Sequence, residues 1–152
     1  MYEALLVTAL AFMTGFFMLP LVSPGTAATA TQLIVPPVPA RVALFCVLFA
    51  VVALYLVWSW TGGRRTLPMK TWRMRIARAD GAPPDARTAL LRYLAAWIGP
   101  VLALVAFALL QERGLGALAL GLLGFNFLWA GVDPDRQFLH DRIAGTRVLR
   151  DD

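Results

Sequence analysis

The sequence predicts an all-α integral membrane protein with four transmembrane helices. Three observations lead to this fold class. Of the 152 residues, 59% are hydrophobic, which is more apolar side chain than a soluble domain of this length can bury. Four long stretches are apolar and carry almost no charge. Apart from Arg41 and Arg113, all lysines and arginines lie between the second and third stretches or after the fourth.

The four apolar stretches form a single predicted domain, residues 1–152, without an internal repeat. A helix of about 18 residues at about 1.5 Å per residue is about 27 Å long, close to the thickness of the hydrocarbon layer. Because lipid offers free backbone groups no hydrogen-bond partner, a spanning segment is expected to be helical. The predicted spans are residues 4–22, 42–60, 93–110 and 115–132.

The first stretch has an alternative interpretation as a cleaved signal peptide, because the small residues 27–30 follow it. Signal peptides begin with positive charge, whereas Glu3 precedes this stretch. We therefore interpret it as a span.

The connections between the spans differ in charge. Residues 23–40 have no charged side chain, whereas residues 61–92 and 133–152 are rich in arginine. The positive-inside rule makes these two segments a cytoplasmic loop and a cytoplasmic tail, and it places both termini in the cytoplasm. The predicted location is the inner membrane of a bacterium.

The middle loop alternates apolar and cationic residues from Trp72 to Ile76. This period of two predicts a short extended segment that lies on the membrane surface. Asp85, after two prolines, is expected to start the helix that enters the third span. Basic residues beside apolar spans indicate anionic lipid headgroups as the partner and not nucleic acid. The predicted headgroup contacts are Arg64, Arg65, Arg73, Arg75 and Arg78.

The fourth stretch has small side chains along one predicted helical face, which would allow another helix to approach closely. That helix could belong to the same four-helix bundle, to a second copy in a homo-oligomer or to a partner subunit. The residues are Ala117, Gly121, Gly124 and Gly131.

In the tail, Asp133 or Asp135 is expected to cap a short helix that ends at Gly145. His140 is the single histidine and has an ordinary pKa near 6.5, so it could change charge near neutral pH, although a structural hydrogen-bonding role is favoured. The tail carboxylates and His140 match no established metal motif, so no metal is predicted. The candidate functional cluster is Glu3, Lys70, Asp133, Asp135, Arg136, His140, Asp141 and Arg142.

Two motifs resemble those of the RDD family of membrane proteins. Residues 140–146 read His-Asp-Arg-Ile-Ala-Gly-Thr, and residues 66–71 read Thr-Leu-Pro-Met-Lys-Thr. The family name refers to an Arg near the start, an Asp in the first span and an Asp in the tail. Asp141 matches the tail residue, whereas the first acid here is Glu3, with no Arg before it. The resemblance implies a transport role, with monovalent cation/proton exchange as the suggested activity.

Glu3 is expected at the cytoplasmic interface, where Lys70, Arg73 or Arg142 could pair with it. An ion pair that fixes the first helix is favoured over proton or cation handling.

The sequence favours an accessory or scaffold subunit that associates with a larger membrane complex and with anionic lipid. No ionisable residue lies at mid-depth of a predicted span, as an ion pump would need. A transporter or transporter subunit is the alternative, and an enzyme acting on lipid headgroups is a distant third. Nucleotide-binding loops, serine nucleophile elbows and zinc-protease motifs are absent from the sequence, so neither an enzyme nor a cofactor is predicted.

Overall fold

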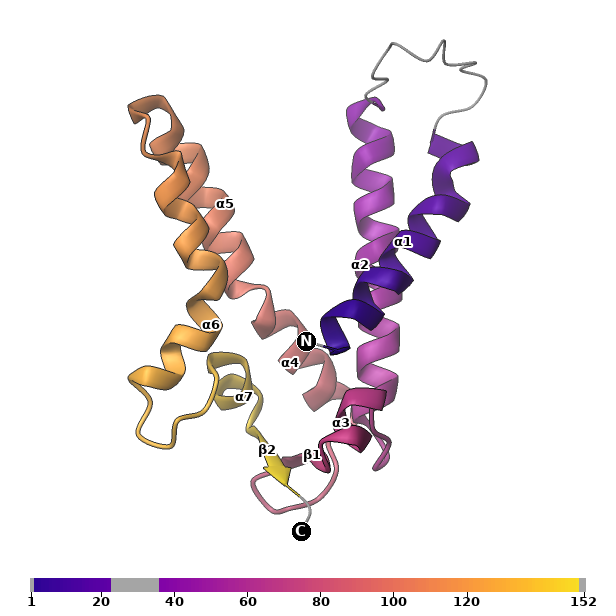
Figure 1. The fold of residues 1–152 in the computed structure, drawn as a ribbon, viewed down its shortest axis with the longest axis vertical. Helices are drawn as coiled ribbons and strands as arrows, with labels where there is room; N and C mark the ends of the chain where they lie inside the picture. Colours follow the sequence, from indigo (N-terminus) through magenta and orange to yellow (C-terminus); the bar gives the residue numbers. More distant parts are fainter. Residues whose placement is uncertain (1, 23–35, 151–152) are drawn as a thin grey trace. The chain divides into compact units, whose positions relative to one another are not determined.

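The computed structural model describes residues 2–22 and 36–150, with residues 2, 3 and 22 described by their backbone alone. The contacts divide the chain into two units, Met1–Tyr55 and Leu56–Asp152. The described residues are mostly helical, and one two-stranded sheet lies in the second unit (Figure 1).

The first unit contains helix α1 (Tyr2–Val22) and most of helix α2 (Val38–Trp60). Both helices are long and apolar enough to cross a membrane. Helix α2 begins four residues before the predicted start at 42, because Pro39 lies in its first turn, where a missing N–H costs no helical hydrogen bond. Large apolar side chains are exposed along both helices, as expected where lipid is the solvent.

The third candidate span runs from Ala86 to Arg113. It consists of α4 (Ala86–Ala96), α5 (Ile98–Leu110) and the 3₁₀ turn η1 (Gln111–Arg113). Asp85 caps its start as expected, since its carboxylate accepts a hydrogen bond from the backbone N–H of Thr88 at 2.8 Å. The chain then reverses at Gly114, whose φ of 72° is a left-handed conformation that favours glycine.

The fourth predicted span is a shorter apolar segment than the other three, Gly116–Gly131. It is built of the 3₁₀ helix η2 (Gly116–Gly124), α6 (Phe125–Leu128) and the 3₁₀ turn η3 (Trp129–Gly131). The prediction of one α-helix over residues 115–132 was therefore wrong in its helix type. A 3₁₀ helix repeats every three residues, so Gly116 and Ala119 share a buried face.

Helix α5 and the η2–α6 segment run side by side (Figure 1). Their backbones approach closely at Gly99, where an added Cβ would lie 2.8 Å from the carbonyl oxygen of Leu122. At the other end of the pair, a Cβ on Gly116 would lie 3.0 Å from the ring of Phe107.

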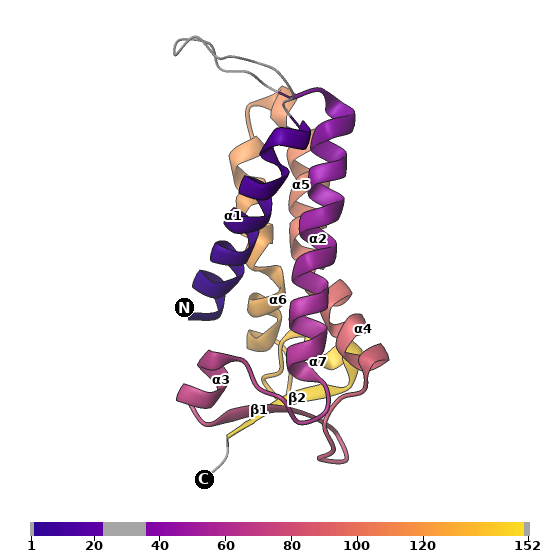
Figure 2. The same cartoon turned by 90° about the vertical axis from the view of Figure 1, so that its right-hand side faces the viewer.

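The opposite end of the second unit is a compact structure, which we call the platform. It contains α3 (Leu67–Thr71), β1 (Met74–Arg78), α7 (Leu139–Ala144) and β2 (Thr146–Arg150) (Figure 2). Strands β1 and β2 are antiparallel, with Met74 opposite Arg150 and Arg78 opposite Thr146. The middle loop and the tail are thus one hydrogen-bonded structure.

The platform departs from the sequence prediction in two places. The extended segment begins at Met74 and not at Trp72, because α3 occupies the preceding residues and is capped by Thr66. Strand β2 was not predicted at all. It forms because Gly145, with a φ of 63°, ends α7 and sends the chain alongside β1.

Candidate functional site

A buried ion pair joins α7 of the platform to α4. Arg92 and Asp141 are 6% and 2% exposed. The Arg92 Nε donates to Asp141 Oδ1 at 2.7 Å, and Nη2 donates to Oδ2 at 3.3 Å. Two parallel hydrogen bonds between a guanidinium and a carboxylate fix the relative orientation of both side chains. The pair therefore fastens α7 to α4.

Two further side chains complete this ion pair. Thr146, the first residue of β2, donates its hydroxyl to Asp141 Oδ1 at 2.7 Å. The ring of Trp60, in the last turn of α2, lies 4.5 Å from the Arg92 Cζ in a cation–π contact. Because a buried charge is costly unless it is paired and hydrogen-bonded, these contacts explain how Arg92 can be buried.

His140 lies at the edge of the same cluster. Its Nε2 is 3.6 Å from Asp141 Oδ2 and 3.5 Å from Arg92 Nη2, and its ring stacks on Phe138. Burial lowers the pKa of His140, the positive charge of Arg92 lowers it further, and Asp141 acts in the opposite direction. The imidazole is therefore favoured in its neutral form. Its Nδ1 is buried without a hydrogen-bond partner among the described residues.

Asp133 organises the turn that leads into α7. Its Oδ2 accepts from the backbone N–H groups of Asp135 at 3.1 Å and Gln137 at 3.0 Å. Arg142 bridges this turn, with Nη1 2.7 Å from Asp135 Oδ2 and Nε 3.8 Å from Asp133 Oδ1. The prediction that Asp133 or Asp135 caps α7 was wrong, because Phe138 occupies the N-cap without a side-chain hydrogen bond. The predicted helix end at Gly145 was correct.

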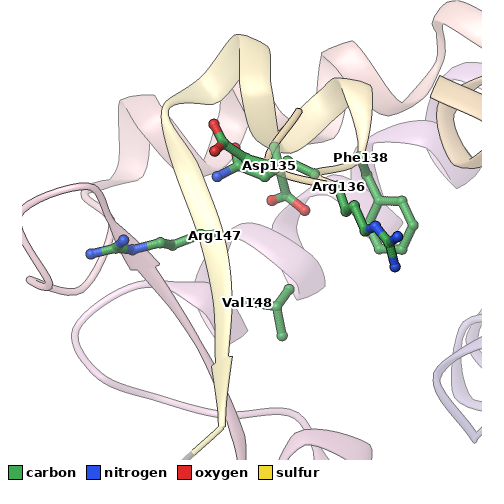
Figure 3. Close-up of a pocket in the computed structure, with 7 residues that line it drawn as sticks. Asp135, Arg136, Phe138, Arg147 and Val148 are labelled. Atoms are coloured by element: carbon green, nitrogen blue, oxygen red, sulfur yellow. The ribbon is translucent and has the colours of Figure 1, made fainter. Parts of the chain in front are cut away.

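A pocket of about 460 Å³ opens beside this turn and is lined in part by Arg136 and Arg147. Arg136 has a φ of 52°, which is uncommon for a residue with a side chain. Figure 3 shows that Arg136 and Arg147 point in opposite directions, so the two cations do not converge on one ligand. The full lining is Asp135, Arg136, Gln137, Phe138, Asp141, Arg147 and Val148.

The structure gathers only part of the candidate functional cluster. His140 and Asp141 belong to the buried ion pair, and Asp133, Asp135 and Arg142 form the adjoining network. Lys70 is exposed on α3, where none of these networks includes it. The Glu3 side chain lies outside the described residues, so its predicted pairing stays a prediction. Among the described residues, no three His, Cys, Asp or Glu side chains group to hold a metal ion.

Sequence reasoning missed Arg92 as a site residue, together with Trp60 and Thr146. The available signal was the position of Arg92, one residue before the predicted third span. An ionisable residue that enters an apolar segment is expected to have a specific partner, but the sequence did not indicate which one.

The arginines predicted to contact lipid headgroups make different contacts in the structure. Arg75 donates to the carbonyl oxygen of Gly81 at 3.0 Å, and Arg78 pairs with Asp80 at 2.7 Å. The hydrogen bond from Arg78 lowers the pKa of Asp80. Both arginines therefore stabilise the turn after β1. Arg73 is exposed at the turn from α3 to β1, and Arg64 and Arg65 line a second pocket.

The small residues of the fourth predicted span do not form the face that contacts α5. A Cβ added to Gly121, Gly124 or Gly131 meets nothing within 4 Å among the described residues, and Ala117 is exposed. The physical reason is the 3₁₀ geometry, which brings Gly116 and Ala119 to the contact instead. A contact of the four predicted residues with another helix or a second copy stays a prediction.

The family comparison agrees with the two motifs in the sequence. The model of the RDD family matches residues 1–145. No curated protein and no solved structure matches the chain. Since the match covers nearly the whole chain, including all three candidate membrane spans, this membrane protein belongs to the RDD family.

Proposed function

We propose that this RDD-family protein is an accessory or scaffold subunit that associates with a larger membrane complex in a bacterial inner membrane, as a single copy or as a homo-oligomer. The observation that carries the proposal is the Arg92–Asp141 pair. Its charges are hydrogen-bonded within the protein and fasten α4 to α7. A buried, hydrogen-bonded charge pair of this kind is suited to keeping α4 and α7 in one fixed arrangement. We assign it no enzymatic reaction.

The pairing of β1 with β2 supports the proposed membrane topology. Paired strands lie on the same side of a bilayer, so the chain between Arg78 and Thr146 crosses it an even number of times. Ala86–Arg113 supplies one crossing by length and composition. We infer that Gly116–Gly131 supplies the second.

The length of this segment supports the inference. A 3₁₀ helix rises about 2.0 Å per residue and an α-helix about 1.5 Å, so η2, α6 and η3 together extend about 30 Å. That length equals the hydrocarbon thickness of a typical bilayer, about 30 Å. With α1 and α2 as the other two crossings, the protein would have four spans.

The orientation follows from charge. Most arginines belong to the platform and the segments beside it, whereas Arg113 follows α5 at the far end of the second unit. We therefore propose that the platform and both termini face the cytoplasm. The basic platform would then lie against anionic headgroups of the inner leaflet.

Gentle detergent extraction, followed by identification of the co-purifying chains, tests the accessory role. We expect a specific membrane partner that is lost with Arg136→Glu, an exposed residue in the turn before α7, and kept with Arg113→Glu, at the other end of the unit. The role fails if the protein is recovered alone or only with itself.

The second candidate function is a transporter or transporter subunit, with monovalent cation/proton exchange as the activity. One observation favours it: the imidazole of His140, a group able to accept a proton, lies beside the buried ion pair. Against it, among the described side chains of α1, α2, α5 and residues 116–131, the only Asp, Glu, Lys, Arg or His is Arg41, in the first turn of α2. Sodium- or potassium-dependent proton flux in vesicles that is reduced by His140→Gln would support exchange, and its absence would exclude it.

A further inference from the structure

A pocket of about 510 Å³ lies where the last turn of α2 meets α3, and its lining is strongly basic. It is lined by Trp58, Gly63, Arg64, Arg65 and Lys70. Three of these five residues are cations, and none is a carboxylate. The sequence has no Asp or Glu between Ala4 and Ala79.

Arg64 is held in a fixed orientation at the wall of the pocket. Its Nε donates to the carbonyl oxygen of Trp58 at 2.6 Å, and its Nη2 donates to the Thr61 hydroxyl at 2.7 Å. The Cζ lies 4.8 Å from the centre of the Trp58 ring. A guanidinium fixed in this way loses little further freedom when an anion binds.

Two glycines make this orientation possible. Gly62 and Gly63 have φ values of 60° and 72°, a left-handed conformation that other residues adopt at a cost. The turn directs Arg64 back over Trp58 and leaves Gly63 without a side chain at the pocket wall.

The surroundings of the pocket are apolar and exposed. Trp58, Leu67 and Trp72 are each about 60% exposed. Leu67 and Lys70 are three residues apart on α3 and so share one helical face. Exposed tryptophans beside cations at the end of an apolar helix are typical of the headgroup region of a bilayer. Phosphate is the anion that a phospholipid carries at this depth.

We propose that this pocket binds the phosphate group of one anionic phospholipid per protein chain. Arg64 stacks on Trp58 and presents a fixed guanidinium, Lys70 supplies a further positive charge, and Leu67 and Trp72 contact the acyl region. The inference rests on the proposed contact of the basic platform with lipid, and it replaces a diffuse attraction by a defined site.

Native mass spectrometry of the full chain, delipidated in detergent, measures the binding. The probe is phosphatidylglycerol, with phosphatidylcholine of equal chain length as the neutral lipid. The variants are Lys70→Gln and, as a matched control, Arg87→Gln, an exposed cation on α4 that does not line the pocket. One lost cation near a headgroup should weaken the affinity for phosphatidylglycerol about fivefold.

The expected result is one tightly bound phosphatidylglycerol that Lys70→Gln weakens and Arg87→Gln does not. Equal weakening by both variants, or by neither, would overturn the defined site. Inorganic phosphate is the soluble competitor, and displacement of the lipid by equimolar phosphate would show that the occupant is a free anion and not a lipid.

A separate measurement distinguishes this inference from the proposed function. If wild-type protein in mixed vesicles enriches anionic lipid around it and Lys70→Gln does so equally, the defined site is wrong while the basic platform stands. If the wild type enriches no anionic lipid, both are wrong.

Discussion

The side-chain amide of Asn126 donates a hydrogen bond to the carbonyl oxygen of Ala96 at 2.8 Å. In an unbroken α-helix, that oxygen would accept from the N–H of residue 100, but Pro100 has no N–H. Asn126 is 3% exposed. Its hydrogen bond gives the Ala96 oxygen a partner in place of the helical N–H that Pro100 lacks. The contact joins α6 to the junction between α4 and α5.

This relationship predicts a non-additive pair of substitutions. Asn126→Ala should lower the free energy of unfolding by about 0.6 to 1.7 kcal/mol, as measured for other hydrogen bonds between membrane helices. In a Pro100→Ala background the loss should be smaller, since the new N–H can bond to the Ala96 oxygen. Unfolding titrations in mixed micelles measure both losses, and equal losses in the two backgrounds would contradict this explanation.

The close approach at Gly99 predicts a position-specific effect of one methyl group. Gly99→Ala places a Cβ against the carbonyl oxygens of Leu122 and Leu123, so α5 and η2 must separate, at a cost of about 1 to 3 kcal/mol. Gly121→Ala is the control, because its Cβ meets nothing within 4 Å among the described residues. Thermal unfolding of the two variants should therefore differ, with Gly99→Ala the less stable.

The buried ion pair predicts that removing one partner destabilises the protein more than replacing both. Asp141→Asn leaves the Arg92 charge buried without a carboxylate, which should cost about 3 to 5 kcal/mol. Replacing both residues, with Arg92→Met and Asp141→Leu, should cost less than either single change. Asp135→Asn breaks only an exposed ion pair with Arg142 and should cost about 1 kcal/mol or less. If Asp141→Asn were as mild as Asp135→Asn, the structural role of the pair would be refuted.

His140 predicts a dependence of stability on pH. Its pKa is lowered in the folded protein, mainly by burial, whereas the unfolded chain has the ordinary value of about 6.5. The unfolded state therefore binds more protons near this pH, and stability is lost as the pH falls from about 6.5 through the lowered pKa. Melting temperatures recorded from about pH 8 to about pH 5 should fall less steeply in His140→Gln than in the wild type. Parallel curves would show that other groups cause the dependence.

The paired strands predict which positions share a side of the membrane. In a Cys46→Ser background, single cysteines at Arg73 and Arg150 should react with a membrane-impermeant thiol reagent from the same side. A cysteine at Glu112, beside the turn after α5, should react from the opposite side. Labelling of Arg73→Cys and Arg150→Cys from different sides would rule out the even number of crossings.

The membrane class of this chain could be predicted from composition alone, because apolar length is a local property. The Asp85 cap and the end of α7 at Gly145 were also predictable, since each depends on a few adjacent residues. The 3₁₀ geometry of η2 was not, because apolar stretches of either helix type have the same composition.

The platform could not be predicted because its contacts join distant residues. Arg92 and Asp141 are 49 positions apart, and β1 is paired with a strand beyond the two apolar segments that follow it. The sequence of the tail alone predicted a short helix that ends at a glycine, and it contained no signal for a strand. The sequence suggested helix caps for the tail carboxylates Asp133 and Asp135. The ion pair of Asp141 depends on Arg92, which lies far away in the sequence.

The order of synthesis gives the ion pair a further consequence. The ribosome makes Arg92 49 residues before Asp141, so the arginine enters the membrane insertion machinery before its carboxylate exists. Thr146 and the whole of β2 come later still. The platform can therefore close only after both preceding apolar segments have been synthesised. A nascent chain that stalls before residue 141 holds Arg92 without its carboxylate, so the charge of Arg92 has its partner only once the tail has been made.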